Sequence, residues 1–304
     1  MFRSAGNPSL DDTLSILIIT YNNENHILAC LNSITWHPKN LDMCIVDNHS
    51  RDGTRKNIEL FCRIHGDYQI RKIWNGSNQG YAAAINQGLT LCAGAWILLL
   101  GPDTRILPGA LEKMRAHLAA NPKTGMVAPR LVDSNGRTHD SVRRFPTSMD
   151  VLLEITGLPR MFPERFRPYW KNSGIENRLV QKVEQPEATC IMVRRDAYTG
   201  VGLMDERFPL FFNDVDWCVR FRKAGWDIDF IQDAVVEHIR GASVNRTPLI
   251  KIWRSHQGFY RYFQKYRTSP AAKLSNQGIG FLLIITAFYR SAIAFLCKNY
   301  GKPA

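Results

Sequence analysis

The sequence lacks several patterns that would assign it to a common class of protein. No GxGxxG motif follows the first apolar run, which disfavours a dehydrogenase. The chain has no internal repeat, no low-complexity tract and no recognisable DNA- or RNA-binding motif. The N-terminal stretch MFRSAGNPSLDDT has no apolar core, so we expect no secretory signal there.

Paired cysteine spacings are also missing. The seven cysteines are scattered, without a CxxC pair or a zinc-binding spacing. Their odd number argues against a complete disulfide framework. We therefore interpret them as reduced thiols in a cytoplasmic chain.

Acidic residues are scarce relative to basic ones: 27 Asp and Glu face 39 Lys and Arg, for a net charge of +12. Such an excess favours an anionic partner, which leaves nucleic acid, an anionic membrane or a phosphate-bearing substrate. Because no nucleic-acid motif is present, we expect no nucleic-acid partner; steep salt-dependent retention on DNA is the observation that would reveal one. The 304 residues suffice for one large domain or a domain with appendages.

Short apolar runs alternate with helix-like segments through the first half of the chain. The predicted strands are Leu14–Tyr21, Met43–Asp47, Ile70–Trp74, Trp96–Leu100 and Met126–Val132. The predicted helices between them are Asn22–Thr35, Thr54–Ile64, Ala82–Cys92 and Pro108–Ala120. This alternation predicts an α/β fold, in which helices flank a doubly wound, mostly parallel sheet.

The second half is less regular. Residues 133–185 are predicted to be irregular, with many arginines among aromatic residues. A strand and a short helix are predicted over Ala188–Tyr198, a helix over Asn213–Trp226, and two short strands over Asp227–Ile239. Residues after about 247 are predicted to be helical.

Each of the first four strands ends in a polar segment. These segments are TYNNEN, DNHSRDGT, NGSNQGY and GPDT. The carboxyl ends of parallel strands meet at one edge, where open α/β sheets bind their ligands. The four segments together predict a site for a polar ligand.

The ordered motifs of the chain resemble those of the family-2 glycosyltransferases with the GT-A fold, and within them the bacterial rhamnosyltransferase-like branch that builds polysaccharides. The resemblance covers Leu14–Ser243. It is carried by SILIITYNNENHILACLNSI, CIVDNHSRDGT, NQGYAAAINQGL, ILLLGPDTRILPGAL, VAPRLVDSNG, RRFPT, LMDERFPLFFNDVDWCVRFRKAGW and AVVEHIRGAS. The resemblance implies inverting transfer of a sugar from a nucleoside diphosphate to an acceptor hydroxyl.

The resemblance also implies a divalent metal, Mg²⁺ or Mn²⁺, held by Asp103 and His238. A carboxylate at a strand end suits either ion, which takes few protein ligands beside phosphate oxygens. Gly101 departs from the family, in which Asn or Asp is usual at that position. Without the resemblance, Asp103 is better explained as a helix N-cap and His238 as a surface residue whose hydrogen bonds are satisfied.

The resemblance places the catalytic base in FFNDVDW. We expect Asp214 to be the base that takes the acceptor proton, with Asp216 as its substitute. Asn213 replaces the first acid of the family's pair. The alternative is that both carboxylates stabilise a helix N-terminus through its dipole.

The remaining predicted site residues bind the donor nucleotide by resemblance. They are Thr20, Tyr21, Asn22, Glu24, Asp47, Ser50, Asp52, Asn78, Gly80, Arg130 and Arg144. Asp47 is expected to accept from a pyrimidine N–H or a ribose hydroxyl, while the arginines suit a diphosphate. Asx-turn chemistry and solvated surface charge are the alternatives for this group.

The C-terminal region differs in character from the rest. Ile279–Cys297 is apolar apart from Arg290, and the segment before it is both basic and aromatic. We expect residues 1–246 to form the catalytic domain and residues 247–304 to associate with the inner face of the cell membrane, lying in the cytoplasmic leaflet in preference to spanning it. The alternative is a helix packed against a homodimer partner.

Expected partners follow from these features. The donor is a nucleoside diphosphate sugar, by analogy dTDP-rhamnose, with UDP sugars next. The acceptor is a glycan or a polyprenyl-diphosphate-linked sugar. Because Gly101 and Asn213 depart from the family, a non-catalytic sugar-nucleotide-binding module is the alternative function; donor hydrolysis with and without Mn²⁺ distinguishes the two.

Overall fold

The computed structural model describes residues 13–36, 41–66, 68–156, 158–162, 164–166, 178–208, 210–239 and 248–299. The N-terminal stretch examined for a signal, the end of the family resemblance at Ser243 and the domain boundary predicted after residue 246 lie outside the described residues.

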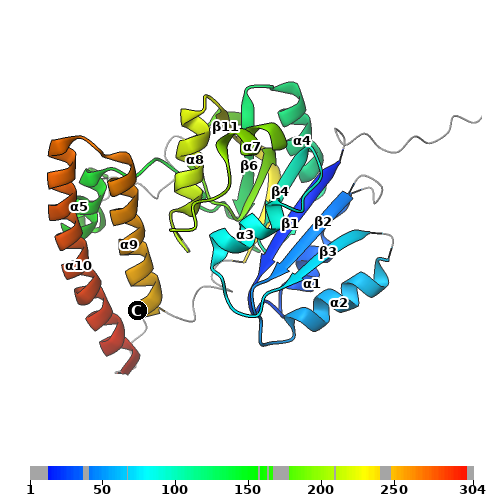
Figure 1. Cartoon of the computed structure of the whole chain (residues 1–304), viewed down its shortest axis with the longest axis horizontal. Helices are drawn as coiled ribbons and strands as arrows, with labels where there is room; N and C mark the ends of the chain where they lie inside the picture. Colours follow the sequence, from blue (N-terminus) through cyan, green and yellow to red (C-terminus); the bar gives the residue numbers. More distant parts are fainter. Residues whose placement is uncertain are drawn as a thin grey trace, which may run out of the picture.

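The chain alternates strands and helices up to residue 120 and then adds further strands and a helical hairpin (Figure 1). The strands are β1 Leu14–Thr20, β2 Leu41–Asp47, β3 Gln69–Trp74, β4 Trp96–Leu100, β5 Thr104–Ile106, β6 Thr124–Val132, β7 Val142–Arg143, β8 Val180–Lys182, β9 Gln185–Pro186, β10 Cys190–Arg194 and β11 Asp227–His238. The helices are α1 Ile27–Asn32, α2 Thr54–Ile64, α3 Tyr81–Leu89, α4 Ala110–Ala120, α5 Ser148–Thr156, α6 Leu158–Met161, α7 Arg195–Val201, α8 Asn213–Lys223, α9 Pro248–Tyr266 and α10 Pro270–Asn299.

One large sheet includes all the strands described up to His238 except β7 and β9, which pair with each other. Its order is β3-β2-β1-β4-β10-β6-β11-β5, with β8 beside β11. The pairs β1–β2, β2–β3 and β1–β4 are parallel, as predicted for the alternating strands, and the pair β6–β11 is also parallel. Strand β10 runs antiparallel to both β4 and β6. Its N-terminal end therefore lies at the same edge as the carboxyl ends of the parallel strands.

Helices cover both faces of the sheet, which makes the fold doubly wound. Leu14, Ile16 and Ile18 of β1 are fully buried in one hydrophobic cluster, with residues of α1, α2 and α4. Leu17 and Ile19 belong to a second cluster, with residues of α3, α7 and α8. Because successive strand side chains point to opposite faces, the uninterrupted apolar run of β1 buries both sides.

Several elements differ from the sequence prediction. Residues 133–185 are not wholly irregular, because they include α5, α6, β7 and β8. The predicted pair of strands over Asp227–Ile239 is one strand, β11, with a register shift between Ile231 and Val235 that explains the break in its pattern. The predicted helix over Asn22–Thr35 shortens to α1, because residues 21–26 form the polar loop after β1.

A hairpin of α9 and α10 stands beside α8 at one end of the molecule, and α5 packs against α10 (Figure 1). A third hydrophobic cluster joins these parts: Phe212 and Val215 pack with Phe259 and Phe263 of α9 and with Leu283 of α10. The predicted apolar C-terminal helix is therefore present. By length and composition, Pro270–Phe295 could cross a membrane, with mean hydropathy 1.7 in an apolar window that is 17% buried.

Candidate active site

The polar loops that follow β1 and β2 are held together by hydrogen bonds. The Asn22 amide donates to Ser50 Oγ at 2.8 Å, and the Gly53 amide donates to Glu24 Oε2 at 2.6 Å. Asp52 accepts from the amides of Glu24 and Thr54 at 3.3 and 3.1 Å. The predicted residues Asn22, Glu24, Ser50 and Asp52 thus converge, and their observed contacts organise the two loops.

The loop after β3 is attached to the same edge by Asn48, which the sequence reading did not select. Its Nδ2 donates to Asn78 Oδ1 at 3.0 Å and to the Gly80 carbonyl at 3.2 Å. Gly80 has φ 85° and directly precedes α3, so a residue free to adopt positive φ is needed there. Asn78 and Gly80 therefore lie beside the loop that follows β2.

Asp47 is the most deeply buried predicted ligand residue. Its Oδ2 accepts from the Ser50 amide at 3.1 Å and from Arg55 Nε at 2.5 Å. Its Oδ1 is buried and has no hydrogen-bond partner among the described residues. A buried carboxylate oxygen without a donor is costly, so this atom is suited to accept from a bound ligand. Thr20 lies beside Asp47 in register and is buried, whereas Tyr21 is 40% exposed.

The two predicted arginines are engaged elsewhere. Arg130 Nε donates to the Gln232 carbonyl at 3.0 Å and so links β6 to the irregular part of β11. Arg144 makes a two-pronged contact with Asp150 of α5. Both side chains therefore make contacts that stabilise the fold.

Asp103 and His238 lie together, as the metal-site prediction requires. His238 Nε2 is 3.7 Å from Asp103 Oδ1, and each side chain is 12% exposed. The His139 ring lies 5.8 Å from the His238 ring, centroid to centroid. Within the described residues no cluster of three or more His, Cys, Asp or Glu side chains is arranged to hold a metal ion. The protein thus offers a carboxylate and an imidazole, and further ligands would come from a bound anion.

Gly101 lies in close quarters beside Asp103. A Cβ at this position would lie 3.2 Å from Asp103 Oδ1 and 3.2 Å from the Thr189 carbonyl oxygen, which itself accepts from the Gly101 amide at 2.7 Å. A side chain there would require the Asp103 carboxylate or the Thr189 backbone to shift by a few tenths of an ångström.

Asp214 lies at the start of α8, within reach of the same edge. Its Oδ1 accepts from the Val215 amide at 2.9 Å, and its Oδ2 accepts from Gln185 Nε2 at 3.2 Å. Burial raises the pKa of Asp214, and the positive charge of Arg143 opposes this rise. A carboxylate whose pKa is raised binds a proton more strongly, which suits a general base.

Asp216 is placed differently from Asp214. It is fully buried and bonds Arg220 Nε at 2.9 Å, Lys265 Nζ at 2.5 Å and Tyr266 Oη at 2.7 Å. Two of these partners belong to α9, so Asp216 holds α8 against the hairpin. The structure therefore separates two acids that the sequence treated as alternatives, and only Asp214 faces the candidate site.

Tyr81 is influenced both by the part of the site that holds Asp103 and by the part that holds Asp214. Burial, followed by the negative charges of Asp214 and Asp103, raises the pKa of its phenol. The Tyr81 hydroxyl donates to the Ala188 carbonyl at 3.1 Å, and the Gly101 amide donates to the carbonyl of the next residue, Thr189, at 2.7 Å. The turn that carries Asp103 is therefore attached to the same segment before β10 whose Gln185 bonds Asp214, although the two acids are far apart in the sequence.

The segment before β10 connects these groups, and the sequence reading missed it. Gln185 bonds Asp214, Glu187 pairs with Arg143 at 2.5 Å, and the Ala188 carbonyl accepts from Tyr81 Oη at 3.1 Å. Arg143 is not among the predicted site residues, although it directly precedes the predicted Arg144. The only signal that could have marked it was its place in RRFPT beside Arg144.

The backbone before Asp214 is strained. Phe212 has φ 67°, a left-handed conformation that is rare for a bulky residue and often found at functional sites. Its ring packs against Phe259 of α9, 4.6 Å between centroids, and a Cβ at Gly258 would lie 2.5 Å from Phe212 Cδ2. The hairpin therefore fixes the residue that leads into α8.

Comparisons with known proteins identify the family of this chain. The family described as Glycosyl transferase family 2 matches residues 15–202. N-acetylglucosaminyl-diphospho-decaprenol L-rhamnosyltransferase of Mycobacterium tuberculosis is 27% identical over 269 residues, which cover 83% of this chain and 84% of the relative. The dTDP-rhamnosyl transferase RfbF of Shigella flexneri is 24% identical over 237 residues, which cover 76% of this chain and 71% of that one.

Solved structures agree on the fold. Mannosyltransferase PcManGT from Pyrobaculum calidifontis, in complex with GDP-Man and Mn²⁺, superposes with a TM-score of 0.58 at 17% identity, over 95% of this chain and 77% of that one. S. aureus TarS 1–349 in complex with UDP gives a TM-score of 0.53 at 16% identity, over 88% and 69% of the two chains. The predicted family resemblance and the predicted GT-A architecture are confirmed.

Proposed function

The chain belongs to glycosyl transferase family 2, and we propose that it transfers a sugar, with inversion, from a nucleoside diphosphate to a hydroxyl of a lipid-linked or glycan acceptor. The observation that supports this proposal is that Asp103 and His238 lie 3.7 Å apart, and that the segment before β10 contacts both Asp214 and the turn that carries Asp103. Rhamnose is the proposed sugar, with dTDP as its carrier and UDP sugars next, because the relatives named above are rhamnosyltransferases.

The donor nucleotide is proposed to bind across the loops that follow β1, β2 and β3. Asp47 Oδ1, buried without a partner among the described residues, accepts the ring N–H of a pyrimidine or a ribose hydroxyl. Arg55 lies over the Trp74 ring, 5.4 Å from its centroid, and orients Asp47 through a hydrogen bond. Tyr21, exposed at the end of β1, offers a ring face to the base.

The donor set at Asp103 and His238 fits a divalent cation. Mg²⁺ and Mn²⁺ accept carboxylate oxygen and imidazole nitrogen, and Mg²⁺ often takes only one or two protein ligands beside phosphate oxygens. We therefore propose Asp103 and His238 as the protein ligands of Mg²⁺ or Mn²⁺. When bound, such an ion would offset the negative charge that develops on the leaving diphosphate.

Asp214 is proposed to act as the general base. The acceptor oxygen forms a bond to the anomeric carbon, the bond from that carbon to the diphosphate breaks, and the acceptor proton passes to Asp214. A single displacement of this kind inverts the anomeric centre. Gln185 and the Val215 amide hold the carboxylate in place. Asp216 is excluded from this role because Arg220, Lys265 and Tyr266 occupy its oxygens.

The hairpin is proposed to bind the cytoplasmic face of a membrane, with residues 248–299 as the attachment region and the sheet domain facing the cytoplasm. Exposed apolar side chains along α10 include Leu274, Phe281, Phe288 and Tyr289. A surface of this kind, with cationic side chains nearby, is typical of an interfacial helix on anionic lipid.

A thermal-shift series tests donor binding. We expect dTDP-rhamnose with Mn²⁺ to raise the melting temperature more than UDP or GDP sugars, since a ligand that binds only the folded state stabilises it. The transfer step is tested with Asp214→Asn, which should bind donor yet lose transfer. Normal turnover by this variant would reject Asp214 as the base.

A further inference from the structure

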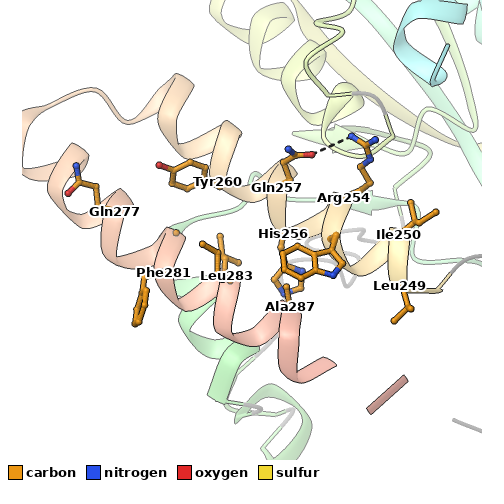
Figure 2. Close-up of a pocket in the computed structure, with 13 residues that line it drawn as sticks. Leu249, Ile250, Arg254, His256, Gln257, Tyr260, Gln277, Phe281, Leu283 and Ala287 are labelled. Atoms are coloured by element: carbon orange, nitrogen blue, oxygen red, sulfur yellow. Dashed lines mark hydrogen bonds between the residues drawn. The ribbon is translucent and has the colours of Figure 1, made fainter. Parts of the chain in front are cut away.

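A groove lies between α9 and α10, and its lining includes none of the residues of the candidate sugar-nucleotide site (Figure 2). It has a volume of about 990 Å³ and is lined mainly by apolar side chains, including Leu249, Ile250 and Trp253 of α9 and Phe281, Leu283 and Ile284 of α10. Volumes near the upper end of the usual range for ligand sites can hold a substantial hydrocarbon chain.

The groove is open to its surroundings. Trp253 is 39% exposed, Ile284 is 52% exposed and Phe281 is 66% exposed. The edge of the Trp253 ring meets Phe288 at 5.0 Å between centroids, so the wall is ordered by contacts between the helices. Exposing this much apolar surface to water is unfavourable, so we expect another molecule to cover it.

A second, basic pocket of about 270 Å³ adjoins the groove. Tyr260 lines both spaces, so the apolar groove continues into a pocket lined by Arg207, Arg261 and Lys265. Arg207 and Lys265 share Asp205, whereas Arg261 donates to the Arg207 carbonyl and has no carboxylate within ion-pair distance among the described residues. One cation is therefore available to an anion.

The positive charge of the hairpin indicates which kind of molecule binds in the groove. Neither α9 nor α10 contains an Asp or Glu, while α9 carries Lys251, Arg254, Arg261 and Lys265. A second copy of this chain, itself of net charge +12, would bring like charge to this surface. A molecule with a hydrocarbon chain and a phosphate matches both the groove and the pocket.

The pocket also adjoins the helix that carries the proposed base. Lys265 Nζ bonds Asp216 Oδ1 at 2.5 Å, and Asp216 lies in the first turn of α8 with Asp214. An anion held at Arg261 and Lys265 therefore lies beside α8, the helix whose first turn carries Asp214. This position suits the acceptor better than an unrelated membrane lipid.

We propose that the groove between α9 and α10 binds the isoprenoid chain of an acceptor in which a sugar is linked to a polyprenyl diphosphate, and that the Arg207–Arg261–Lys265 pocket binds its diphosphate; undecaprenyl phosphate is the probe for the lipid part of this acceptor. This inference rests on the proposed function, because it identifies the acceptor lipid of that reaction. The shared residue Tyr260 joins the two parts of the site.

Vesicle binding by the full chain tests the proposal. Three vesicle types are compared: phosphatidylcholine alone, phosphatidylcholine with undecaprenyl phosphate, and phosphatidylcholine with phosphatidylglycerol at the same mole fraction. We expect undecaprenyl phosphate to strengthen binding about tenfold more than phosphatidylglycerol, a difference of about 1.4 kcal/mol. Equal binding to both anionic lipids would overturn the proposal, since it would show a general charged surface.

Two matched pairs of variants locate the site. Ile284→Trp places a large ring in the groove and should remove the preference for undecaprenyl phosphate, whereas Ile285→Trp, on the same helix but not lining the groove, should retain it. Arg261→Gln should reduce the preference, and Arg290→Gln, which removes the same charge outside the pocket, should not. Equal behaviour within both pairs would contradict the assigned site.

Separate readouts keep this inference distinct from the proposed function. Ile284→Trp should bind the donor nucleotide as the unchanged protein does, because it lies outside the donor loops. If lipid preference is absent while donor binding and transfer persist, the acceptor site is wrong and the transferase assignment stands. If Ile284→Trp instead abolishes a concentration-dependent dimer, the groove is a self-association surface and the proposal fails.

Discussion

The carboxylate of Asp103 lies 3.7 Å from Nε2 of His238, and the pairing of two strands brings them together. Strand β5 runs antiparallel to β11 with Thr104 opposite His238, and the Ile239 amide donates to the Asp103 carbonyl at 3.0 Å. The backbone pairing of β5 and β11 therefore brings Asp103 and His238 together without a bound ligand.

This pair leads to a prediction about metal dependence. Asp103→Asn should lower transfer about 10²–10³-fold, because the leaving diphosphate would lose much of its charge stabilisation. A chelator should lower activity of the unchanged protein, and added Mn²⁺ should restore it. Asp233→Asn is the matched control, because that carboxylate pairs with Lys113 on the surface. Full activity of Asp103→Asn in chelator would contradict the assignment.

Asp214→Asn should lower transfer about 10²–10⁴-fold, the usual contribution of a general base, and should also change stability in a pH-dependent way. Burial raises the pKa of Asp214 in the folded state, so the folded protein favours the protonated acid. Above that pKa, the charged carboxylate therefore lowers the free energy of unfolding. The variant should melt higher than the unchanged protein near neutral pH, and the difference should vanish below the ordinary Asp range. Melting curves across pH measure this, and a lower melting temperature at neutral pH would argue against a buried charged base.

Arg143 offers a test of the same group by a different route. Its positive charge lowers the pKa of Asp214 against the effect of burial, so Arg143→Gln should raise that pKa further. Because the base acts when deprotonated, the acid limb of the pH–rate profile should move to higher pH in the variant. Arg130→Gln, whose guanidinium contacts the Gln232 carbonyl, serves as the control and should leave the limb in place.

Strands β1–β4, β6 and β10, and the edge to which the first four polar segments lead, could be predicted from the sequence, because apolar runs and polar loop segments are local patterns; the short strands β5, β7, β8 and β9 could not. The closeness of Asp103 and His238 came only from the resemblance, since β5 is three residues long and gives no periodic signal. Asp214 and Asp216 could not be told apart, because their difference depends on Lys265 and Tyr266 of α9. The sequence could not show that Arg144 pairs with Asp150, because nothing in the local pattern indicates that contact. Arg144 was therefore predicted as a ligand residue in place of Arg143.

Asp47 provides a prediction about donor affinity. Asp47→Asn keeps the shape of the side chain. The single oxygen of the asparagine amide would accept the hydrogen bonds from Arg55 and the Ser50 amide that Asp47 Oδ2 accepts now. The amide nitrogen would then replace the accepting Oδ1, so nucleotide affinity should fall at least about tenfold, or about 1.4 kcal/mol. Isothermal titration with the nucleoside diphosphate measures this. Asp52→Asn, whose carboxylate contacts only loop groups in the described structure, should retain most of the affinity.

Lys265 gives a prediction about how the hairpin is held to the sheet domain. Its ammonium bonds both Asp216 at 2.5 Å and Asp205 at 2.7 Å and is 25% exposed. Lys265→Met would leave the buried Asp216 with fewer partners, so we expect a loss of about 1–3 kcal/mol in the free energy of unfolding. Arg207→Gln is the control, because Arg207 also pairs with Asp205 but is 71% exposed, and it should cost about 0–1 kcal/mol.

The pH dependence of this loss follows from Asp205. Hydrogen bonds from Arg207 and Lys265 hold the pKa of Asp205 well below its usual range in the folded protein. A lowered pKa contributes stability that is present above the ordinary Asp pKa and is lost as the pH falls toward the folded value. The gap in unfolding free energy between Lys265→Met and the unchanged protein should therefore be full at neutral pH and narrow on acidification below about pH 4. Urea unfolding at a series of pH values measures it, and a gap that widens in acid would show that Lys265 acts through packing and not through its charge.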